Sequence, residues 1–428
     1  MPKPSGPVLG IDFGTSNSAA ALVDMAGHLH LIALEGSRTG MPTALYFSSE
    51  DGHLSFGTTA IQAYLTDVQD GVGAGRLMRA IKSLLGSALM DEQTEVHGQA
   101  LSFFDILVLF FCELKRRAEA QLGYSVHAAM LGRPVHFVDD NPERDTLAQA
   151  TLHRAAQAAG FDNVAFELEP IAAAFDFERR IQRETRVLVA DIGGGTSDFT
   201  VIRLRPGPRP MQDRKGDVLA TSGVHLGGTD FDRLLNLGCV MPLLGHGQRT
   251  PGGRELPNRI FFELATWHLV HHASSRKSLA EARSLWRDYA DLAQHQRLLH
   301  VLTERLGHQL LAEVERTKIA CSEQQRPQAI DLSCLHLPTK TPPTPAELSL
   351  DAMHQRLQPQ LGAITECARQ CVADAGLLQP DVLYLTGGSS ALSPLINELR
   401  AAFPAVQLVQ GDRFAGVASG LAWAARPP

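Results

Sequence analysis

Long hydrophobic runs and clustered positive charge are both missing from this sequence. The longest apolar stretch, around Phe103–Cys112, falls far short of the ~20 residues that a membrane-spanning helix needs, so it predicts a buried helix. The formal net charge is −7 at pH 7, and the basic residues alternate with acidic ones. Because nucleic acids and anionic membranes are bound by clustered Lys and Arg, neither is an expected partner.

Closely spaced cysteine pairs are also missing. The six cysteines are spread over 428 residues, and none has the C-x-x-C spacing of a zinc ribbon or a redox site. The first residues, Met1–Pro7, contain neither the apolar core nor the cleavage site of a signal peptide. Reduced thiols and a cytoplasmic location are therefore expected.

What the sequence does contain is a repeated hairpin pattern. Val8–Phe13 reads as a strand that ends in a turn of small residues and resumes at Ala19, and Val187–Ile192 does the same before Phe199–Leu204. Two copies predict a duplicated lobe. Segments of helical periodicity alternate with further strands, which indicates an α/β fold with a partly parallel sheet. The further segments are expected helices at Phe104–Gln121, Arg144–Ala159, Leu350–Ala375, Pro394–Ala402 and Gly416–Ala425, and expected strands at Ala128–Gly132, Val218–Ser222 and Val382–Thr386.

The expected division is a first lobe at residues 1–185 and a second at 186–428. The second lobe carries a polar, helical insertion at about residues 230–323, and Lys340–Pro345 is too rich in proline for a regular element. No β-rich peptide-binding domain is expected within this length.

The two hairpin tips have the composition of phosphate-binding turns. Backbone N–H groups hold phosphate oxygens best where side chains are small enough to permit close approach. Asp12 and Asp191 precede the tips at the ends of buried strands, and Mg²⁺ is usually held by one or two carboxylates together with phosphates. A third glycine turn, before the helix at Pro394, suits an adenosine site. The candidate residues of these three turns are Gly14, Thr15, Ser16 and Asn17; Gly193, Gly194, Gly195 and Thr196; and Gly387, Gly388 and Ser389.

Two further side chains suit phosphoryl chemistry. Asp198 can accept a hydrogen bond from a water molecule, and Lys82 can neutralise charge on a transferred phosphoryl group. An exposed helical lysine is the alternative interpretation of Lys82.

Four motifs in this order resemble the phosphate and adenosine motifs of the seventy-kilodalton heat-shock (DnaK-type) ATPases. The resemblance implies an actin-like, ribonuclease H-like duplicated fold with two lobes around a cleft that takes ATP or ADP with Mg²⁺. The motifs are Gly10-Ile11-Asp12-Phe13-Gly14-Thr15-Ser16-Asn17-Ser18, Asp191-Ile192-Gly193-Gly194-Gly195-Thr196-Ser197-Asp198-Phe199, Leu226-Gly227-Gly228-Thr229-Asp230-Phe231-Asp232 and Thr386-Gly387-Gly388-Ser389-Ser390.

The resemblance also implies roles for single residues. Lys82 matches the catalytic lysine, and Glu169 matches a hinge glutamate that contacts metal-bound water. Gly227 and Gly228 match a nucleotide-contacting turn. Along one helix, Glu315, Lys318 and Ser322 match ribose or adenine contacts, with a plain solvated helix as the alternative. Ile319 and Ala391 stand where the family usually has two arginines that enclose adenine, so base preference is left open.

The resemblance implies a slow ATPase related to the chaperones, which uses lobe closure as a switch and acts on a protein partner or co-chaperone. Short DnaK-like proteins, the YegD-like branch, are similar in layout. Three other functions share the fold: a nucleotide sensor without significant turnover, a small-molecule kinase and a filament-forming protein.

Overall fold

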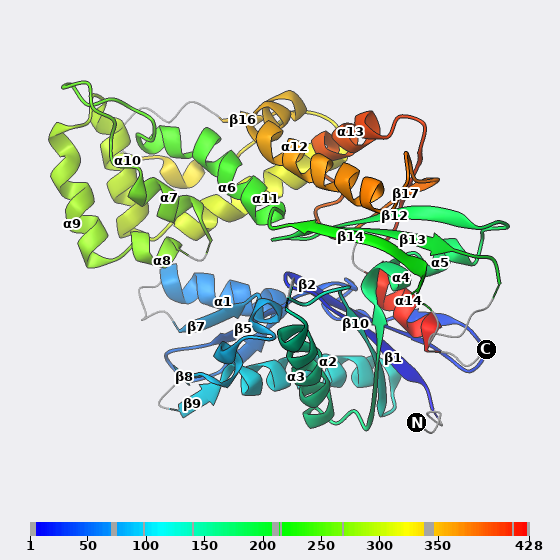
Figure 1. Ribbon diagram of the computed structural model, residues 1–428. Coiled ribbons are helices and arrows are strands. Elements are labelled where there is room, and N and C mark those ends of the chain that lie inside the picture. The colour runs from blue at the N-terminus through cyan, green and yellow to red at the C-terminus, as the bar shows by residue number, and fades with distance from the viewer. Residues whose placement is uncertain are drawn as a thin grey trace.

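Two β-sheets with the same strand order form the framework of the molecule, which is known from a computed structural model (Figure 1). The first sheet has the order β3-β2-β1-β10-β11. Its first three strands are antiparallel, and β10 and β11 run parallel to β1. The strands are β1 (Val8–Phe13), β2 (Asn17–Val23), β3 (Leu29–Leu31), β10 (Ala128–Arg133) and β11 (Asn163–Leu168), with β4 (Met41–Pro42) paired to β2. The structure describes residues 6–69, 75–96, 99–138, 141–207, 214, 216–267, 269–337, 346–412 and 415–425.

The second sheet repeats this arrangement. Its order is β14-β13-β12-β17-β18, again with an antiparallel meander followed by two parallel strands. The shared topology confirms the duplication that the two hairpins predicted. The strands are β12 (Thr185–Ile192), β13 (Ser197–Leu204), β14 (Val218–Val224), β17 (Val382–Thr386) and β18 (Gln407–Gln410).

Helices cover each sheet and close a separate core. The first core joins β1 and β10 to α2 (Phe103–Leu122) and α3 (Pro142–Ala158). The second joins β12 and β13 to α12 (Leu350–Asp374) and α13 (Ser393–Ala402). These helices lie within two residues of the expected bounds. Their caps explain their starts: the Ser102 hydroxyl accepts from Asp105 N–H, and the Asn141 side chain accepts from Arg144 N–H ahead of Pro142.

Two helices pack between the sheets. The last helix, α14 (Gly416–Ala424), lies against β1, β2 and α4 (Glu169–Ala173) and so returns to the first sheet. This approach depends on glycine, because a Cβ at Gly10 would lie 2.5 Å from Ala422 N and one at Gly420 would lie 1.9 Å from Ala172 O. The division at residue 185 stays a prediction. By sequence α14 belongs to the second expected lobe, but it packs on the sheet of the first.

Each sheet also carries an added part on the same side of the molecule. On the first it contains the small sheet β6-β5-β7, and on the second it is the helical segment expected at about 230–323 (Figure 1). The expected loop Lys340–Pro345 and residues 208–213 lie outside the described residues. The elements of the first part are β5 (Ala44–Phe47), β6 (Leu54–Phe56), α1 (Gly57–Gln69), β7 (Arg76–Arg79), η1 (Ile81–Leu84), η2 (Ala88–Asp91), β8 (Gln93–Val96) and β9 (Gln99–Ser102). The elements of the second are α6 (Gly228–Cys239), η4 (Met241–Leu244), α7 (Arg259–Ala265), α8 (Val270–Ala273), α9 (Arg276–Ser284), η5 (Leu285–Arg287), α10 (Leu292–Thr303) and α11 (Gly307–Gln324). The short elements α5 (Phe175–Glu178), β15 (Gln328–Ala329), η6 (Ser333–Leu335) and β16 (Glu347–Leu348) complete the described fold.

Candidate functional site

The tips of the two hairpins meet between the sheets. A Cβ atom added to Gly194, in the β12–β13 tip, would lie 2.1 Å from the hydroxyl oxygen of Ser16 in the β1–β2 tip. The second tip is a tight turn, closed by a hydrogen bond from Gly193 N–H to Thr196 O of 2.9 Å. The residues at both tips, Gly14–Asn17 and Gly193–Thr196, are partly exposed, so they line a surface that a ligand can reach.

The third motif packs directly on the second tip. Gly228 N–H donates to Gly193 O (3.1 Å), and the Thr229 N–H and hydroxyl both donate to Gly194 O (2.7 Å each). A Cβ at Gly227 would fall 2.6 Å from Gly194 C, so only glycine allows this contact. The turn Gly227–Gly228, at the start of α6, therefore supports the Gly193–Thr196 turn.

The fourth motif closes the same site from β17. A Cβ at Gly387, which has a φ of +86°, would lie 2.3 Å from a carboxylate oxygen of Asp191. Ser389 N–H donates to Ile192 O at 2.9 Å, and a Cβ at Gly228 would meet the Ser389 hydroxyl at 2.3 Å. All four sequence motifs thus converge on one place, as the expectation of a shared site required.

Two carboxylates face each other below the tips. Asp12 ends β1 and Asp191 ends β12, and both are partly accessible although protein atoms surround them. Burial, followed by the charge of Glu169, raises the pKa of Asp12 to about 8. Burial, then Glu169 and Asp198, raise the pKa of Asp191 to about 7. Each acid destabilises the charged form of its neighbours. The acidic groups around the site therefore outnumber the basic group, Lys82, that offsets them.

Lys82 offsets part of that negative charge. Its ammonium group donates to Glu169 Oε1 at 2.8 Å, and both side chains are more than four-fifths buried. Burial alone would lower the pKa of Lys82, but Glu169 and Asp12 outweigh it and raise that pKa. Lys82 belongs to η1, which follows Ala80, a residue in the left-handed region at φ 55°. This buried ion pair contradicts the alternative of an exposed, solvated lysine.

Thr196 and Asp198 form a pair at the mouth of the second tip. The Thr196 hydroxyl donates to Asp198 Oδ2 at 2.9 Å, and Asp198 lies directly across the hairpin from Asp191. Asp198 is exposed, so its carboxylate can also reach a solvent molecule.

One face of α11 borders the other end of the site. Lys318 pairs with Asp232 at 2.7 Å and donates to Gly228 O at 3.4 Å, and both charged side chains are buried. Burial raises the pKa of Asp232 to about 6, against the lowering effect of Lys318. Ser322 is buried one turn further along the same face, whereas Glu315 and Ile319 are exposed.

Two contributors escaped the sequence analysis. Asp232 was quoted within a motif but given no role, although its place four residues after Gly228 puts it one helical turn inside α6. Thr43 comes from the loop after β4, and its hydroxyl donates to Gly14 O at 2.8 Å while bonding to Ser18. No local pattern marks Thr43, because its partners are 25 or more residues away in the chain.

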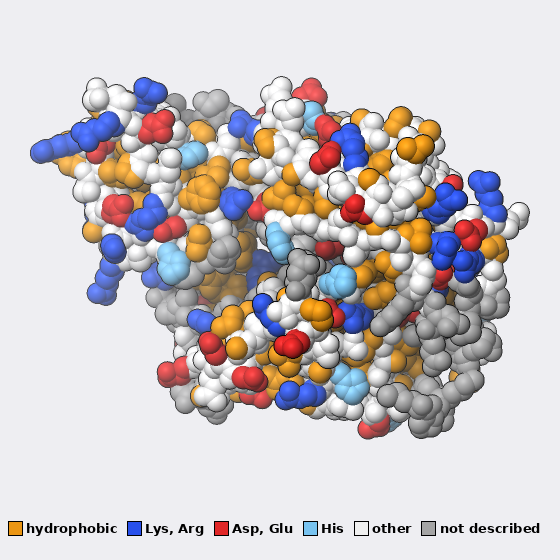
Figure 2. All heavy atoms as spheres, viewed as in Figure 1, with side chains coloured by type: hydrophobic (Ala, Val, Ile, Leu, Met, Phe, Trp, Pro, Cys, Tyr) orange, Lys and Arg blue, Asp and Glu red, His pale blue; other side chains and the backbone are white. Residues whose placement is uncertain are grey.

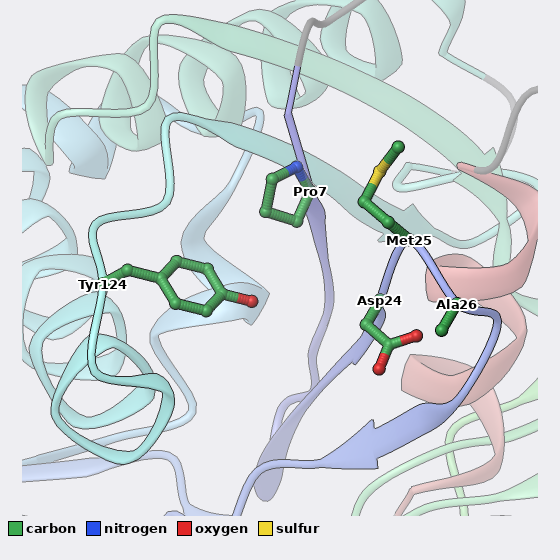
Figure 3. Close-up of a pocket in the computed structure, with 5 residues that line it drawn as sticks. All are labelled: Pro7, Asp24, Met25, Ala26 and Tyr124. Carbon is green, nitrogen blue, oxygen red and sulfur yellow. The ribbon is translucent and has the colours of Figure 1, made fainter.

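Other surface features lie away from this site. A hollow lined by Pro7, Asp24, Met25, Ala26 and Tyr124 lies at the opposite end of β1 and β2 from their hairpin tip (Figure 3). Among the described residues no group of three or more His, Cys, Asp and Glu side chains is arranged to hold a metal ion. No helix in the described part of the chain is both long and apolar enough to span a membrane.

The paired sheets and facing hairpin tips are those of an actin-like ATPase fold. Residues 8–240, more than half of the chain, match the family model described as Hsp70 protein, and the chain belongs to the Hsp70 family. The fold and family expected from the motifs are therefore confirmed.

Relatives called chaperone protein DnaK match about half of the chain. The protein of Methanothermobacter thermautotrophicus is 31% identical over 232 residues, which are 53% of this chain and 35% of that protein. The protein of Nitrosopumilus maritimus is 33% identical over 235 residues, 54% of this chain and 33% of that protein. The matched region thus spans about a third of the length of these relatives.

Proposed function

We propose that this protein binds Mg·ATP between its two sheets and hydrolyses it slowly to ADP and phosphate, with closure of the lobes as the readout. The contact between Ser16 and Gly194 is the observation that carries the proposal, because it brings both phosphate-type turns to a single ligand. The membership in the Hsp70 family supports the choice of nucleotide.

The carboxylate pair fits a divalent cation. Asp12 and Asp191 have pKa values raised to about 8 and about 7, and a cation between them would favour their ionised forms. Mg²⁺ would be held by these two side chains with water and phosphate oxygens, and it would supply charge neutralisation at the phosphates. Glu169 would orient a water of that shell rather than bind the ion.

The remaining residues would position the phosphates and the attacking water. Backbone N–H groups of Gly14–Asn17 and Gly193–Gly195 would hold phosphate oxygens, together with the hydroxyls of Thr15 and Thr196. Lys82 would exchange its bond to Glu169 for the transferred phosphoryl group and stabilise the charge that develops there. Asp198, already joined to Thr196, would accept a hydrogen bond from the water.

The nucleoside end would lie against α11 and the turns of the second sheet. Glu315, Lys318 and Ser322 would contact the ribose or base, with Gly227, Gly228, Gly387, Gly388 and Ser389 forming the floor. We further propose a cytoplasmic protein that acts through a protein partner or co-chaperone. All six cysteines are free thiols, which agrees with that location.

Phosphate release from radiolabelled ATP tests the enzymatic part of the proposal. We expect the wild type to release phosphate with Mg²⁺ present, and the Lys82→Ala variant to be slower by about 10² or more. Stoichiometric ATP binding without release above the Lys82→Ala level would replace the ATPase by a nucleotide sensor.

A further inference from the structure

A bridge of rings and one cation joins the two added parts of the molecule across the mouth of the site. Trp267 follows α7 in the second part, and the Arg79 guanidinium at the end of β7 in the first part lies 4.6 Å from its ring centroid. Trp267 also meets His308 of α11 edge to face, with 4.6 Å between ring centroids. The surface is hollowed along the line where the two halves of the molecule meet (Figure 2).

The bridge is anchored at its far end on α1. The Tyr64 hydroxyl and His308 Nε2 are 3.0 Å apart, and their rings pack edge to face. Figure 1 shows α1 directly facing α8 across the gap. The contact therefore holds the two added parts together at a defined distance.

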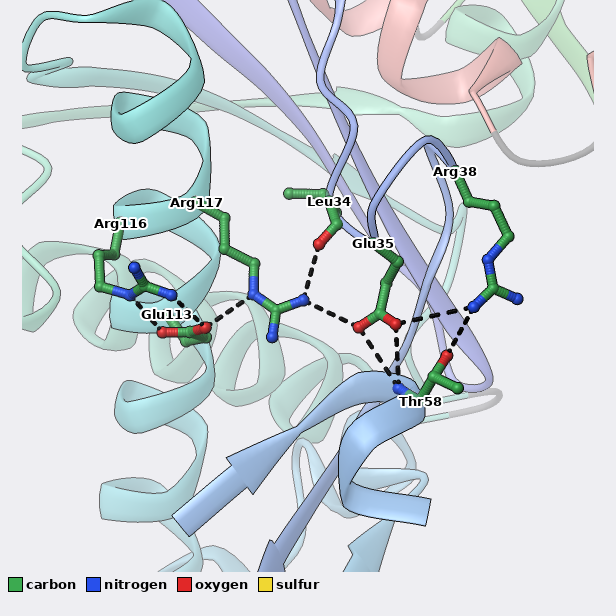
Figure 4. A network of polar contacts seen from close by, with 7 residues as sticks. All are labelled: Leu34, Glu35, Arg38, Thr58, Glu113, Arg116 and Arg117. Carbon is green, nitrogen blue, oxygen red and sulfur yellow. Dashed lines mark hydrogen bonds and ion pairs between the residues drawn. The ribbon is translucent and has the colours of Figure 1, made fainter. Parts of the chain in front are cut away.

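A polar network fixes the start of α1 (Figure 4). The buried Glu35 carboxylate accepts from Thr58 N–H at 3.3 Å and pairs with Arg117 at 2.8 Å, and Arg117 also pairs with Glu113 of α2. A Cβ at Gly57, which has a φ of +63°, would lie 1.9 Å from a carboxylate oxygen of Glu35, so glycine at this position allows the carboxylate to approach the start of the helix. α1 is thus a rigid support for Tyr64.

Arg79 is the cation of the bridge, and its hydrogen-bond donors are uncommitted. The side chain is exposed, and within the described residues its guanidinium makes no hydrogen bond. Its electrostatic neighbours are Glu315 and Asp232, the acids that border the nucleoside end of the site. A planar guanidinium held against an aromatic ring retains an open face and free N–H groups, which suit stacking on a base or bonding to a ribose.

The turn at Ala80 explains how one short segment serves both ends of the site. Ala80 adopts φ 55° and ψ 33°, a conformation that non-glycine residues rarely take. Lys82, after the turn, bonds to Glu169 beside Asp12, whereas Arg79, before it, lies near α11. Ile319, one turn along α11 from Glu315, adds an exposed apolar side chain to the same face.

We infer that Arg79, stacked on Trp267, is a nucleoside-contacting residue that the first lobe supplies to the site, and that it couples the bound nucleoside to the bridge Tyr64–His308–Trp267. The inference rests on the proposed function, since it names a further contact of the same nucleotide. It concerns the base and ribose, and leaves the binding of the phosphates to the hairpin tips.

Calorimetric titration with two probes tests this assignment. Mg·ATP carries a nucleoside and magnesium tripolyphosphate does not. We expect Arg79→Ala to weaken Mg·ATP binding at least tenfold and to leave tripolyphosphate binding within twofold of the wild type. Arg79→Lys should also lose most of the affinity for ATP, because an ammonium group cannot stack. Arg76→Ala removes the same charge from the same strand and should change neither ligand.

Three results would overturn the inference. Wild-type affinity for ATP in Arg79→Ala would show that Arg79 does not contact the nucleoside. An equal loss of affinity for both probes would show that Arg79 acts only through its positive charge. A loss in Arg76→Ala as large as in Arg79→Ala would point to the charge of β7 as a whole. A wild type that binds neither probe would instead contradict the proposed function. Trp267→Phe keeps an aromatic face for Arg79, so its ATP affinity should exceed that of Arg79→Ala even if a smaller ring loosens the bridge.

Discussion

Ser16 and Gly194, which are more than 150 residues apart in the chain, touch across the junction of the two sheets. The hydroxyl of Ser16 occupies the space that any Cβ at position 194 would need, at 2.1 Å from the ideal Cβ position. The two tips therefore form one surface, and glycine at 194 is a packing requirement as well as a means of phosphate approach.

Replacement of Gly194 by alanine should push the tips apart. We expect Gly194→Ala to lower the free energy of unfolding without nucleotide by about 1–3 kcal/mol, the usual cost of overpacking, as measured by urea titration. Gly195→Ala is the control, since a Cβ there meets nothing within 4 Å. Ser16→Gly should recover part of the loss in the double variant. Equal stabilities of Gly194→Ala and Gly195→Ala would mean that the tips do not touch.

The carboxylate pair predicts a stability that falls as the pH rises. Folded Asp12 and Asp191 have pKa values of about 8 and about 7 against an unfolded value of 3.8, so the folded state binds more protons between these limits. Their contribution is complete below about pH 4 and is lost as the pH approaches 8.

Denaturation of the protein without ligand from pH 5 to 8, in EDTA and then in Mg²⁺, measures this effect. The decline should be smaller in Asp12→Asn, which removes one of the two titrations, and smaller for the wild type with saturating Mg·ADP. A wild type whose stability follows the same pH curve as Asp12→Asn would show that Asp12 is ionised throughout.

Removing one partner of the ion pair between Lys318 and Asp232 should lower the stability, whereas replacing both partners by apolar residues should change it little. Lys318→Met leaves a buried carboxylate without its partner, and about 3 kcal/mol of stability should be lost. The double variant Lys318→Met with Asp232→Leu should return close to wild-type stability yet bind ATP weakly. If Lys318→Met alone were as stable as the wild type, Asp232 would have to be satisfied by another group.

Ala80 offers a prediction in the stabilising direction. A left-handed conformation costs an L-residue about 1–2 kcal/mol, so Ala80→Gly should raise the unfolding free energy by about 1 kcal/mol or less after the entropy of glycine is counted. Ala88→Gly in η2, where the backbone is right-handed, should instead lower it. Thermal unfolding of both variants measures the difference. A loss of stability in both variants would show that the backbone at Ala80 is not strained.

Much of the framework was predictable because its signals are local. The strands at Val8 and Val382 were placed to the residue, and α2 and α3 to within two, since apolar periodicity and turn residues lie within each segment. The glycine turns were equally visible. What local patterns cannot supply is the partner of a side chain from a distant segment.

Apart from Asp232, which lies within a motif, the missed features are of that kind. Thr43 acts on Gly14 from another loop, Trp267 meets Arg79 from the other added part, and α14 returns to β1 from the end of the chain. Each contact depends on packing that only the folded chain brings about. A lone Thr, Trp or Arg in the sequence carries no mark of it.

Calorimetric titration of ATP into the wild type and Asp191→Ala, with and without Mg²⁺, tests the central claim most directly. The account predicts tight binding that requires Mg²⁺ and is lost in the variant, because the carboxylate of Asp191 would hold the ion between the two tips. Unchanged ATP affinity in Asp191→Ala would contradict it.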